Sequence, residues 1–433
     1  MNRAKIQSLK NISAEHLSGI QLYLSALQKS TSIGAKIHTE TGSLTRLLGI
    51  SKSCGEGEIL VLSQDGLENF EKNIIKNLAE ETVSIKRLER GASVSLTLAS
   101  SIASAITAST KIIIATGGGV VCDISKIVAN ICNLPLCFVP SAPTSDGTLS
   151  PFAMAISDGT TKMIPAKAPD FVVCDASACV DIPAKLVRAG FGDVVSNYLA
   201  IFDWMVARDF GNTEFAEEIA YIAISSADKA IFAAETYLQN KEHGIELMFD
   251  AVLLSSGAMA LAKKNSPCCG GEHSVAIALS KLAPQNFMHG ELVFYCFCKL
   301  TEIYATFFSS FSKGKYLPPD TFARCDFLIA NFDMTEEQAE LACKMPISED
   351  EYKIMKEKYR VCRLRYLTNI KKLQKKLPKL KALFFSLHDS DIESFKTDGT
   401  TFSKALGIAP DIEDKFTTLT IMREFGVLDS AVF

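Results

Sequence analysis

Ile112-Ile113-Ile114-Ala115-Thr116-Gly117-Gly118-Gly119-Val120-Val121-Cys122-Asp123-Ile124-Ser125-Lys126 is the stretch that decides the fold. A β-branched run ends in three glycines, and a segment compatible with a helix follows. This order of strand, glycine turn and helix lets backbone N–H groups approach a phosphate at a helix N-terminus. The spacing is not Gly-x-Gly-x-x-Gly, so a plain tight turn between a strand and a helix remains the alternative.

Other short apolar runs around this stretch have the composition of strands, and helix-like segments such as 96–107 separate the earlier ones. The predicted strands are 59–62, 111–116, 136–139 and 171–174. After residue 180 the predicted elements are all helices: 183–189, 204–208, 214–240, 247–264, 292–311 and 336–380. Strands that alternate with helices predict a parallel sheet covered on both faces. We therefore expect an α/β Rossmann-like nucleotide-binding domain over residues 1–175 and an all-α domain over residues 176–433.

A polar loop follows the predicted strand 136–139: Pro140-Ser141-Ala142-Pro143-Thr144-Ser145-Asp146-Gly147-Thr148-Leu149-Ser150-Pro151. It lies at the carboxyl edge of the predicted sheet, which is where open α/β sheets bind their ligands. The loop is therefore a candidate binding segment, and a turn without a ligand is the alternative.

Composition limits the class of protein. A chain of 433 residues is too long for one core, and its net charge of −4 gives no electrostatic reason to expect a nucleic-acid partner. The basic run 371–376 is interpreted as the solvated face of a helix. We find no apolar run long enough to cross a membrane and no signal-peptide core, so no membrane association is expected. Thirteen dispersed cysteines indicate reduced thiols and a cytoplasmic protein.

Three residues far apart in the sequence form a candidate metal site: Asp193, His273 and His289, all in glycine-flanked polar settings. One carboxylate and two imidazoles bind a divalent ion and leave a position for a substrate oxygen. Zinc is the expected ion, with nickel, iron or manganese as alternatives. A single histidine is more often an ordinary surface or core residue. Thiolate ligation by Cys268 and Cys269 is less favoured, because adjacent cysteines chelate one ion poorly.

In chain order, these motifs resemble those of the sn-glycerol-1-phosphate dehydrogenases, in the superfamily of iron-containing alcohol dehydrogenases and dehydroquinate synthase, with the bacterial branch most similar. The motifs that carry the resemblance are Gly117-Gly118-Gly119 with Asp123 and Lys126, Asp146-Gly147 with Ser150-Pro151, Ala189-Gly190-Phe191-Gly192-Asp193, Asp203-Trp204, Gly271-Glu272-His273 and His289-Gly290-Glu291. The resemblance implies a Rossmann-like N-terminal domain and a helical, dehydroquinate synthase-like C-terminal domain.

The resemblance also implies roles for individual residues. Asp193, His273 and His289 match the three metal ligands, which are also the catalytic residues. Asp146 and Asp193 match substrate contacts. The residues that match the NAD(H)- or NADP(H)-binding set are Gly117, Gly118, Gly119, Val120, Val121, Asp123, Ser141, Thr144 and Ser150. The expected partner is a small phosphorylated hydroxyketone or polyol, and the expected assembly is a homodimer.

Two positions near the expected substrate depart from the family pattern. Members usually carry a histidine four residues after the first ligand histidine, where this chain has Ile277. They usually carry a lysine four residues after the ligand aspartate, where this chain has Asn197. The loss of a cation and an imidazole weakens the case for dihydroxyacetone phosphate as the substrate.

The resulting hypothesis is a metal- and NAD(P)-dependent dehydrogenase that converts dihydroxyacetone phosphate to sn-glycerol 1-phosphate or acts on a related hydroxyketone. A sugar-phosphate cyclase of the dehydroquinate synthase type, a lyase that uses NAD transiently, is the alternative. Asp193 argues against it, because those cyclases usually carry Glu there. A non-catalytic descendant is a third possibility that the intact ligand triple disfavours. Asp65, after the strand 59–62, favours NADH if it meets the cofactor ribose.

Overall fold

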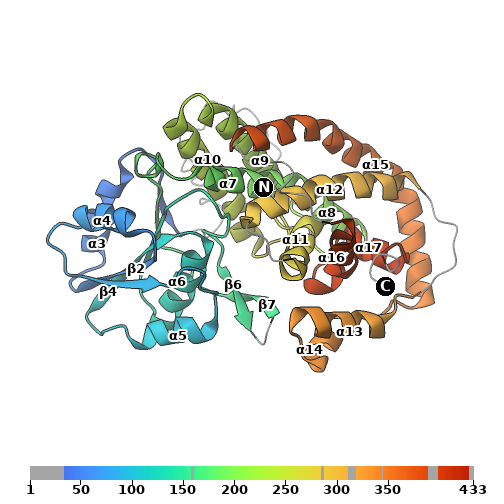
Figure 1. Ribbon diagram of the computed structural model, residues 1–433, viewed down its shortest axis with the longest axis horizontal. Coiled ribbons are helices and arrows are strands. Elements are labelled where there is room, and N and C mark those ends of the chain that lie inside the picture. The colour runs from blue at the N-terminus through green and yellow to red at the C-terminus, as the bar shows by residue number, and fades with distance from the viewer. Residues whose placement is uncertain are drawn as a thin grey trace. The chain divides into compact units, whose positions relative to one another are not determined.

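A computed structural model describes residues 34–157, 160–283, 287–310, 318–343, 345–388 and 398–428 (Figure 1). The chain forms two compact units. The first unit contains the described residues of Met1–Ser157, Thr161–Val194 and Ser225–Lys264. The second unit consists mainly of the described residues of Val195–Ile224 and Asn265–Phe433.

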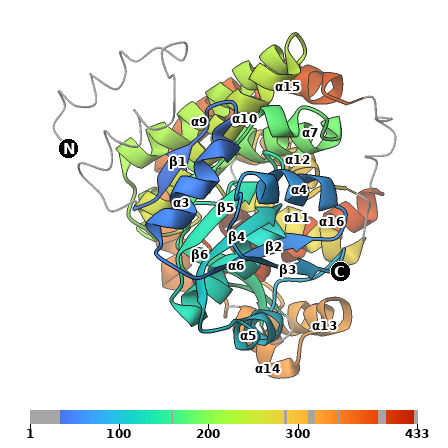
Figure 2. The same cartoon turned by 90° about the vertical axis from the view of Figure 1, so that its left-hand side faces the viewer.

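A six-stranded sheet forms the centre of the first unit, with the strand order β1-β8-β5-β4-β2-β3 (Figure 2). Its strands are β1 (Lys36–His38), β2 (Glu58–Gln64), β3 (Val83–Leu88), β4 (Thr110–Gly117), β5 (Leu136–Pro140) and β8 (Phe171–Val173). Every neighbouring pair is parallel. The four predicted strands are confirmed as β2, β4, β5 and β8. Sequence reasoning missed β1, which is very short, and β3, whose four central residues are exposed and carry no apolar run.

Both faces of this sheet are covered, as the alternation of strands and helices predicts. Leu60 and Ile113 belong to a hydrophobic cluster that includes α5 (Leu96–Ser104) and α6 (Gly119–Cys132). Their neighbours in the strands are also fully buried and, because side chains alternate along a strand, point to the opposite face. Two further helices of this unit are α3 (Leu47–Ser53) and α4 (Glu68–Lys76). All of β4 is therefore buried, and the glycine turn at its end is held on a rigid support.

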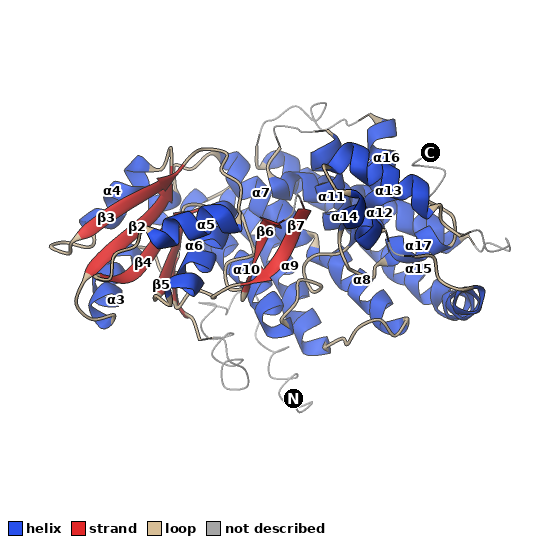
Figure 3. Ribbon diagram, turned by 90° about the horizontal axis from the view of Figure 1, so that it is seen from below, coloured by secondary structure: helices blue, strands red, loops and turns tan. Residues whose placement is uncertain are grey.

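A small hairpin of β6 (Phe152–Ser157) and β7 (Thr160–Pro165) follows the polar loop and was not predicted. Beyond residue 180, every described regular element is helical, as predicted (Figure 3). These helices are α7 (Ala184–Val195), α8 (Asn197–Asp209), α9 (Glu217–Tyr237), α10 (Lys241–Ala262), α11 (Gly271–Leu282), α12 (His289–Ser309), α13 (Thr321–Phe332), α14 (Glu336–Ala342), α15 (Glu349–Ser386), α16 (Gly399–Ile412) and α17 (Thr418–Glu424).

The helix predictions need correction in two respects. The single helix expected over 336–380 is two helices, because Ser348 starts α15 with a capping box in which its side chain and that of Glu351 satisfy each other's backbone N–H groups. Helices α11, α13, α16 and α17 were not predicted. Helix α11 has Gly270 as its N-cap and Gly271 as its first residue, and glycine has a low helix propensity. The basic run 371–376 is confirmed as an exposed face of α15. The thirteen cysteines all lie within the described residues, and none forms a disulfide bond.

The two compact units do not divide the chain at residue 175. That position follows the last strand of the sheet, β8, and marks the change from strands to helices. Helix α10 nevertheless belongs to the sheet unit, since its Ser255 and Ser256 bond to Asp146 and Leu149 of the polar loop. The predicted division into domains 1–175 and 176–433 stays a prediction.

Helices α10 and α12 are long and apolar enough to cross a membrane, which corrects the expectation that no run reaches this length. In α10, 78% of the most apolar window is buried inside the protein, and in α12 the share is 67%. Packing against neighbouring elements accounts for their composition, as in the core helices of soluble proteins.

Candidate active site

The glycine turn has one glycine that the fold requires and one that it does not. Gly117 has φ +155°, and a Cβ there would lie 2.5 Å from Cγ2 of Val121. Gly118 is the N-cap of α6, and a Cβ there would meet nothing nearer than the Thr144 hydroxyl, at 3.7 Å. The bare backbone at Gly118 therefore leaves room beside the first N–H groups of α6, which have no partner within their own helix.

The turn lies where the sheet reverses its direction of growth. From β2 the chain adds β3 on one side, then crosses back to add β4 and β5 on the other. The carboxyl ends of β2 and β4 therefore flank a topological switch point, which is where open α/β sheets bind nucleotides. Register places Leu62 opposite Ala115, so the end of β2 lies level with Gly117.

The polar loop follows β5 at the carboxyl edge of the sheet, as predicted, and lies beside the glycine turn. Gly117 pairs with Pro140, and the N–H of Ser141 donates to the Gly117 carbonyl at 3.2 Å. A small hollow between them is lined by Gly117, Gly118, Gly119, Cys122, Phe138, Pro140, Ala142, Thr144, Ser145 and Thr148. Of the predicted cofactor contacts, Thr144 faces this hollow, whereas the side chain of Val121 is fully buried and can offer only its backbone.

Lys126 of α6 fixes the far end of the polar loop. Its side chain is fully buried, and Nζ donates to the Gly147 carbonyl, to the Ser150 hydroxyl at 3.1 Å and to the Phe152 carbonyl at 3.1 Å. Asp123, within 3.3 Å of the same ammonium, accepts from the N–H of Met154 at 3.0 Å. These contacts give Asp123 and Ser150 a role in shaping the loop, and direct cofactor contacts by either residue stay a prediction.

Asp146, the predicted substrate contact, is hydrogen-bonded to α10. The Ser255 hydroxyl donates to its carboxylate at 2.6 Å. Ser256 accepts from the N–H of Leu149 at 2.5 Å, so two adjacent serines of one helix anchor the loop. Only 7% of Asp146 is exposed, and its orientation is therefore set by the protein.

The predicted metal ligands come together. Among the described residues, one possible ligand atom from each of Asp193, His273 and His289 lies within 4.8 Å of the others. Asp193 is in the last turn of α7, His273 in the first turn of α11, and His289 is the first residue of α12. The two imidazole ring centres are 5.4 Å apart. Asp193 and His273 are buried, and His289 is exposed.

A buried carboxylate contacts the first histidine. Oε1 of Glu272 lies 2.9 Å from Nδ1 of His273 and also accepts from the N–H of Gly270 at 2.7 Å. Burial of the pair leaves 7% of the His273 side chain and none of the Glu272 side chain exposed.

Asp203 of α8 is hydrogen-bonded to three other helices next to Glu272 and His273. Its carboxylate accepts from the N–H of Gly271 at 2.9 Å, from the Tyr304 hydroxyl at 3.1 Å, and from the N–H and hydroxyl of Thr418 at 2.9 and 2.6 Å. Burial raises the pKa of Asp203 to about 6, and the charge of Glu272 adds to the rise, while Thr418 and Gly271 oppose it. The start of α11, which carries His273, is thus fixed to α8, α12 and α17.

A second ionic group contacts α11 and the segment before it. Glu413 accepts from the Ser274 hydroxyl at 2.7 Å and lies 3.4 Å from the ammonium of Lys415. The same ammonium donates to the Cys269 carbonyl at 3.0 Å. This pair holds the chain between α16 and α17 against the segment before His273.

The two positions that depart from the family pattern differ in surroundings. Asn197 is fully buried at the start of α8, and its amide donates to the Ala223 carbonyl at 3.4 Å. Ile277 is half-buried, one helical turn after His273 and therefore on the same face of α11.

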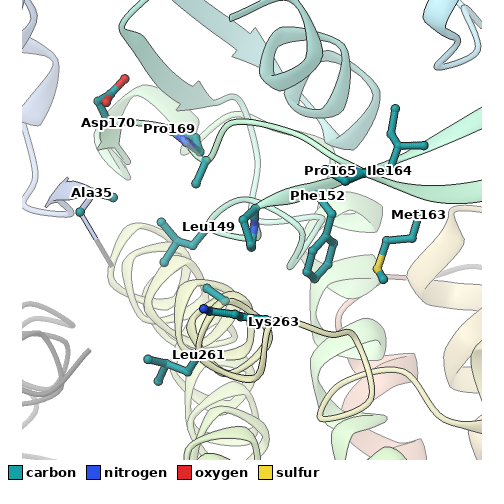
Figure 4. Close-up of a pocket in the computed structure, with 14 residues that line it drawn as sticks. Ala35, Leu149, Phe152, Met163, Ile164, Pro165, Pro169, Asp170, Leu261 and Lys263 are labelled. Carbon is teal, nitrogen blue, oxygen red and sulfur yellow. The ribbon is translucent and has the colours of Figure 1, made fainter. Parts of the chain in front are cut away.

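A separate, mainly apolar cavity of about 710 Å³ lies between the polar loop, β7 and the end of α10 (Figure 4). Its lining includes Leu149, Phe152, Met163, Pro165, Leu261, Asp170 and Lys263. Asp170 already accepts from the N–H of Leu136 at 2.8 Å. The cavity brings together no set of polar groups comparable with the metal-ligand group.

Sequence reasoning left several of these supporting residues without a role: Lys126, Asp203, Ser255, Ser256, Glu272, Glu413, Lys415 and Thr418. Three of them had a local signal. Glu272 directly precedes a ligand histidine, and Ser255-Ser256 interrupts the apolar run of α10. The others act through contacts between distant parts of the chain.

Residues 38–183 of this chain match the family described as iron-containing alcohol dehydrogenase. The glycerol-1-phosphate dehydrogenase (NAD(P)+) of Methanothrix thermoacetophila is 34% identical over 180 residues, which are 42% of this chain and 51% of that protein. The enzyme of the same name from Methanococcoides burtonii is 32% identical over 236 residues, or 54% and 62% of the two chains. The matches thus span about half to three fifths of these relatives. The expected similarity to bacterial members stays a prediction.

Solved structures match over most of the chain. Glycerol dehydrogenase from Schizosaccharomyces pombe covers 92% of this chain and 89% of its own, with a TM-score of 0.54 and 18% identity. NADH-dependent butanol dehydrogenase A from Thermotoga maritima covers 92% and 96%, with a TM-score of 0.57 and 13% identity. The fold is therefore that of the iron-containing alcohol dehydrogenases: a parallel α/β sheet domain followed by a helical region, as predicted.

Proposed function

We propose that this protein is a metal-dependent NAD(P)H oxidoreductase that interconverts a small hydroxyketone and its alcohol. The convergence of Asp193, His273 and His289 carries the proposal. A carboxylate and two imidazoles fit a divalent ion, with zinc expected and nickel or iron as alternatives. The names of the relatives support dehydrogenase chemistry, and the apolar helices with largely buried faces support a soluble, cytoplasmic enzyme. A homodimer is expected.

The residues have separable tasks in this reaction. The bound ion would polarise the ketone as a Lewis acid, and the nicotinamide would supply hydride. Asp193, His273 and His289 would hold the ion. The N–H groups after Gly118 would hold the pyrophosphate at the start of α6, while Lys126 and Ser255 keep the polar loop, with Thr144 and Asp146, in one conformation. Rigid support of this kind holds the reacting carbons in register.

The surroundings of Asp65 support NADH over NADPH. The N–H of Asp65 donates to the Leu88 carbonyl at 3.0 Å, which holds Asp65 at the ends of β2 and β3. Arg87 of β3 is engaged by the buried carboxylate of Glu71, with three N–H to O distances of 2.8 to 3.0 Å. The 2′-phosphate of NADPH at this edge of the sheet would be repelled by the carboxylate of Asp65. Arg87 could not easily offset this repulsion, because it is already paired with Glu71.

The test of the proposed function is NADH oxidation by the metal-loaded protein with dihydroxyacetone phosphate, dihydroxyacetone and related ketones. Net oxidation of NADH in proportion to alcohol formed supports a dehydrogenase. A cyclase would regenerate its NAD and show no net oxidation, and a protein without catalysis would convert no substrate. Failure of every ketone, in a protein that binds stoichiometric metal and NADH, would contradict the proposal.

Gly118→Val is expected to raise the dissociation constant for NADH at least tenfold, which is about 1.4 kcal/mol. A Cβ at this position meets nothing in the protein closer than 3.7 Å, so the fold should tolerate it while the side chain blocks the cofactor's approach. Isothermal titration with NADH measures the effect, and thermal unfolding checks the fold. Unchanged affinity would count decisively against a pyrophosphate at this turn.

Dihydroxyacetone phosphate is expected to be a poor substrate of the wild-type protein. Apolar Ile277 cannot donate a hydrogen bond or relay a proton, and Asn197 has no charge to offset a phosphate dianion. The double variant Ile277→His with Asn197→Lys should raise kcat/KM for dihydroxyacetone phosphate. Because Asn197 is fully buried, a lysine there disturbs the packing, so Ile277→His is also tested alone. Steady-state kinetics decide: wild-type kcat/KM of roughly 10⁴ M⁻¹s⁻¹ or more would show that these residues do not alter specificity.

A further inference from the structure

We propose that Glu272 is a positioning residue for the metal ion: its carboxylate fixes the tautomer and the ring orientation of His273. This inference rests on the proposed metal site. Oε1 of Glu272 is 2.9 Å from Nδ1 of His273, and a carboxylate at this distance favours the tautomer in which Nδ1 keeps its proton and donates a hydrogen bond to Oε1. A neutral imidazole with its proton on Nδ1 has its lone pair on Nε2, which is the atom left to bind the ion.

The backbone holds this carboxylate rigidly. The N–H of Gly270, the N-cap of α11, donates to the same Oε1 at 2.7 Å, and a carboxylate is favoured at a helix N-terminus. Gly270 has to be a glycine for the arrangement to exist, because a Cβ there would lie 2.7 Å from Oε2 of Glu272 and 2.9 Å from Cα of Ala200. The side chain of Glu272 is fully buried, so it has no freedom to turn away from His273.

Packing alone does not explain a charged residue at this place. Oε2 of Glu272 is buried and forms no hydrogen bond within the described residues. Its charge also acts unfavourably on the carboxylate of Asp203. A buried carboxylate with an unsatisfied oxygen costs folding free energy, and glutamine of nearly the same shape would avoid part of that cost. The charge is therefore retained for its action on His273, where it raises the basicity of the metal-binding nitrogen.

The decisive experiment compares metal affinity with the stability of the metal-free protein. Full-length wild type, Glu272→Gln, Glu272→Ala and the control Glu413→Gln are stripped of metal. Zn²⁺ affinity is then measured by competition with a chromophoric chelator, Co²⁺ binding by its visible spectrum, and stability by denaturant unfolding. Glu413 is a matched control, because its charge acts on His273 while its hydrogen bond goes to Ser274.

We expect Glu272→Gln to weaken Zn²⁺ binding about tenfold and Glu272→Ala to weaken it by up to about a hundredfold. The visible spectrum of bound Co²⁺ should change in both variants. Glu413→Gln should change affinity far less. Metal-free Glu272→Gln should be as stable as the wild type or more so, because the repulsion with Asp203 is relieved. A purely structural role for Glu272 would instead lower stability together with affinity.

Wild-type metal affinity in both Glu272 variants would overturn the inference, as would an equal loss in Glu413→Gln, which would assign the effect to charge alone. If Glu272→Ala does not fold, Glu272→Gln decides by itself. A fifth protein, His289→Ala, separates this inference from the proposed function. Full metal binding by His289→Ala would show that the ligand set itself is wrong, whatever the Glu272 variants do.

Discussion

Asp193→Ala is expected to strip the metal and to lower kcat/KM by at least about a thousandfold, equivalent to about 4 kcal/mol of transition-state stabilisation. Asp193 supplies the single carboxylate of the ligand group and is 3% exposed, so no solvent-borne ligand replaces it easily. Two imidazoles alone bind a divalent ion weakly, and the ketone would lose its Lewis acid. Metal content by elemental analysis and NADH oxidation rates measure the two losses.

The fold of this variant should survive, because the substitution removes a ligand and adds no bulk. NADH affinity at the glycine turn is the check, since that turn lies in the sheet and does not depend on the ion. Asp181→Ala is the matched control, being the same substitution at an exposed position shortly before α7. A full equivalent of metal with wild-type turnover in Asp193→Ala would show that the ligand assignment is wrong.

The sheet and its glycine turn were predictable because their causes are local. The run from Ile112 to Ala115 is apolar at every position, which is typical of a strand buried on both faces, and Gly117-Gly118-Gly119 ends it. The strand β3 was missed for the converse reason: its central residues face solvent, and the pairing with β2 is what makes it a strand.

The candidate site was predictable only in part. Asp193, His273 and His289 are chemically conspicuous, and the structure brings them together. The contacts that support them are not visible in the sequence, because Asp203 reaches Thr418 across 215 residues and the Ser255 hydroxyl reaches Asp146 across 109. A buried polar residue takes its role from the partner that folding brings to it, and no local pattern records that partner.

The sequence Gly190-Phe191-Gly192-Asp193 raises a question that only the structure answers. Glycine inside a helix costs about 1 kcal/mol relative to alanine, so a helical glycine needs a reason. At Gly190 a Cβ would lie 1.7 Å from the Pro143 carbonyl oxygen. Helix α7 therefore touches the backbone of the polar loop at the turn that precedes Asp193, and the glycine is what permits this approach.

Gly190→Ala is accordingly expected to destabilise the protein by about 1–3 kcal/mol, the usual cost of overpacking, despite the better helix propensity of alanine. The helix and the loop must separate, and Asp193, one turn further along α7, must move with the helix. Since a displacement of about 1 Å in a catalytic group can cost a hundredfold in rate, activity should fall further than stability alone explains.

Denaturant unfolding, Zn²⁺ affinity and NADH oxidation together test this expectation. Gly49→Ala is the matched control, because Gly49 is also inside a helix, α3, but a Cβ there meets nothing within 4 Å. Gly49→Ala should be neutral or stabilising by up to about 1 kcal/mol, with unchanged activity. If Gly190→Ala were as harmless as Gly49→Ala, the contact of α7 with the polar loop would not be what positions Asp193.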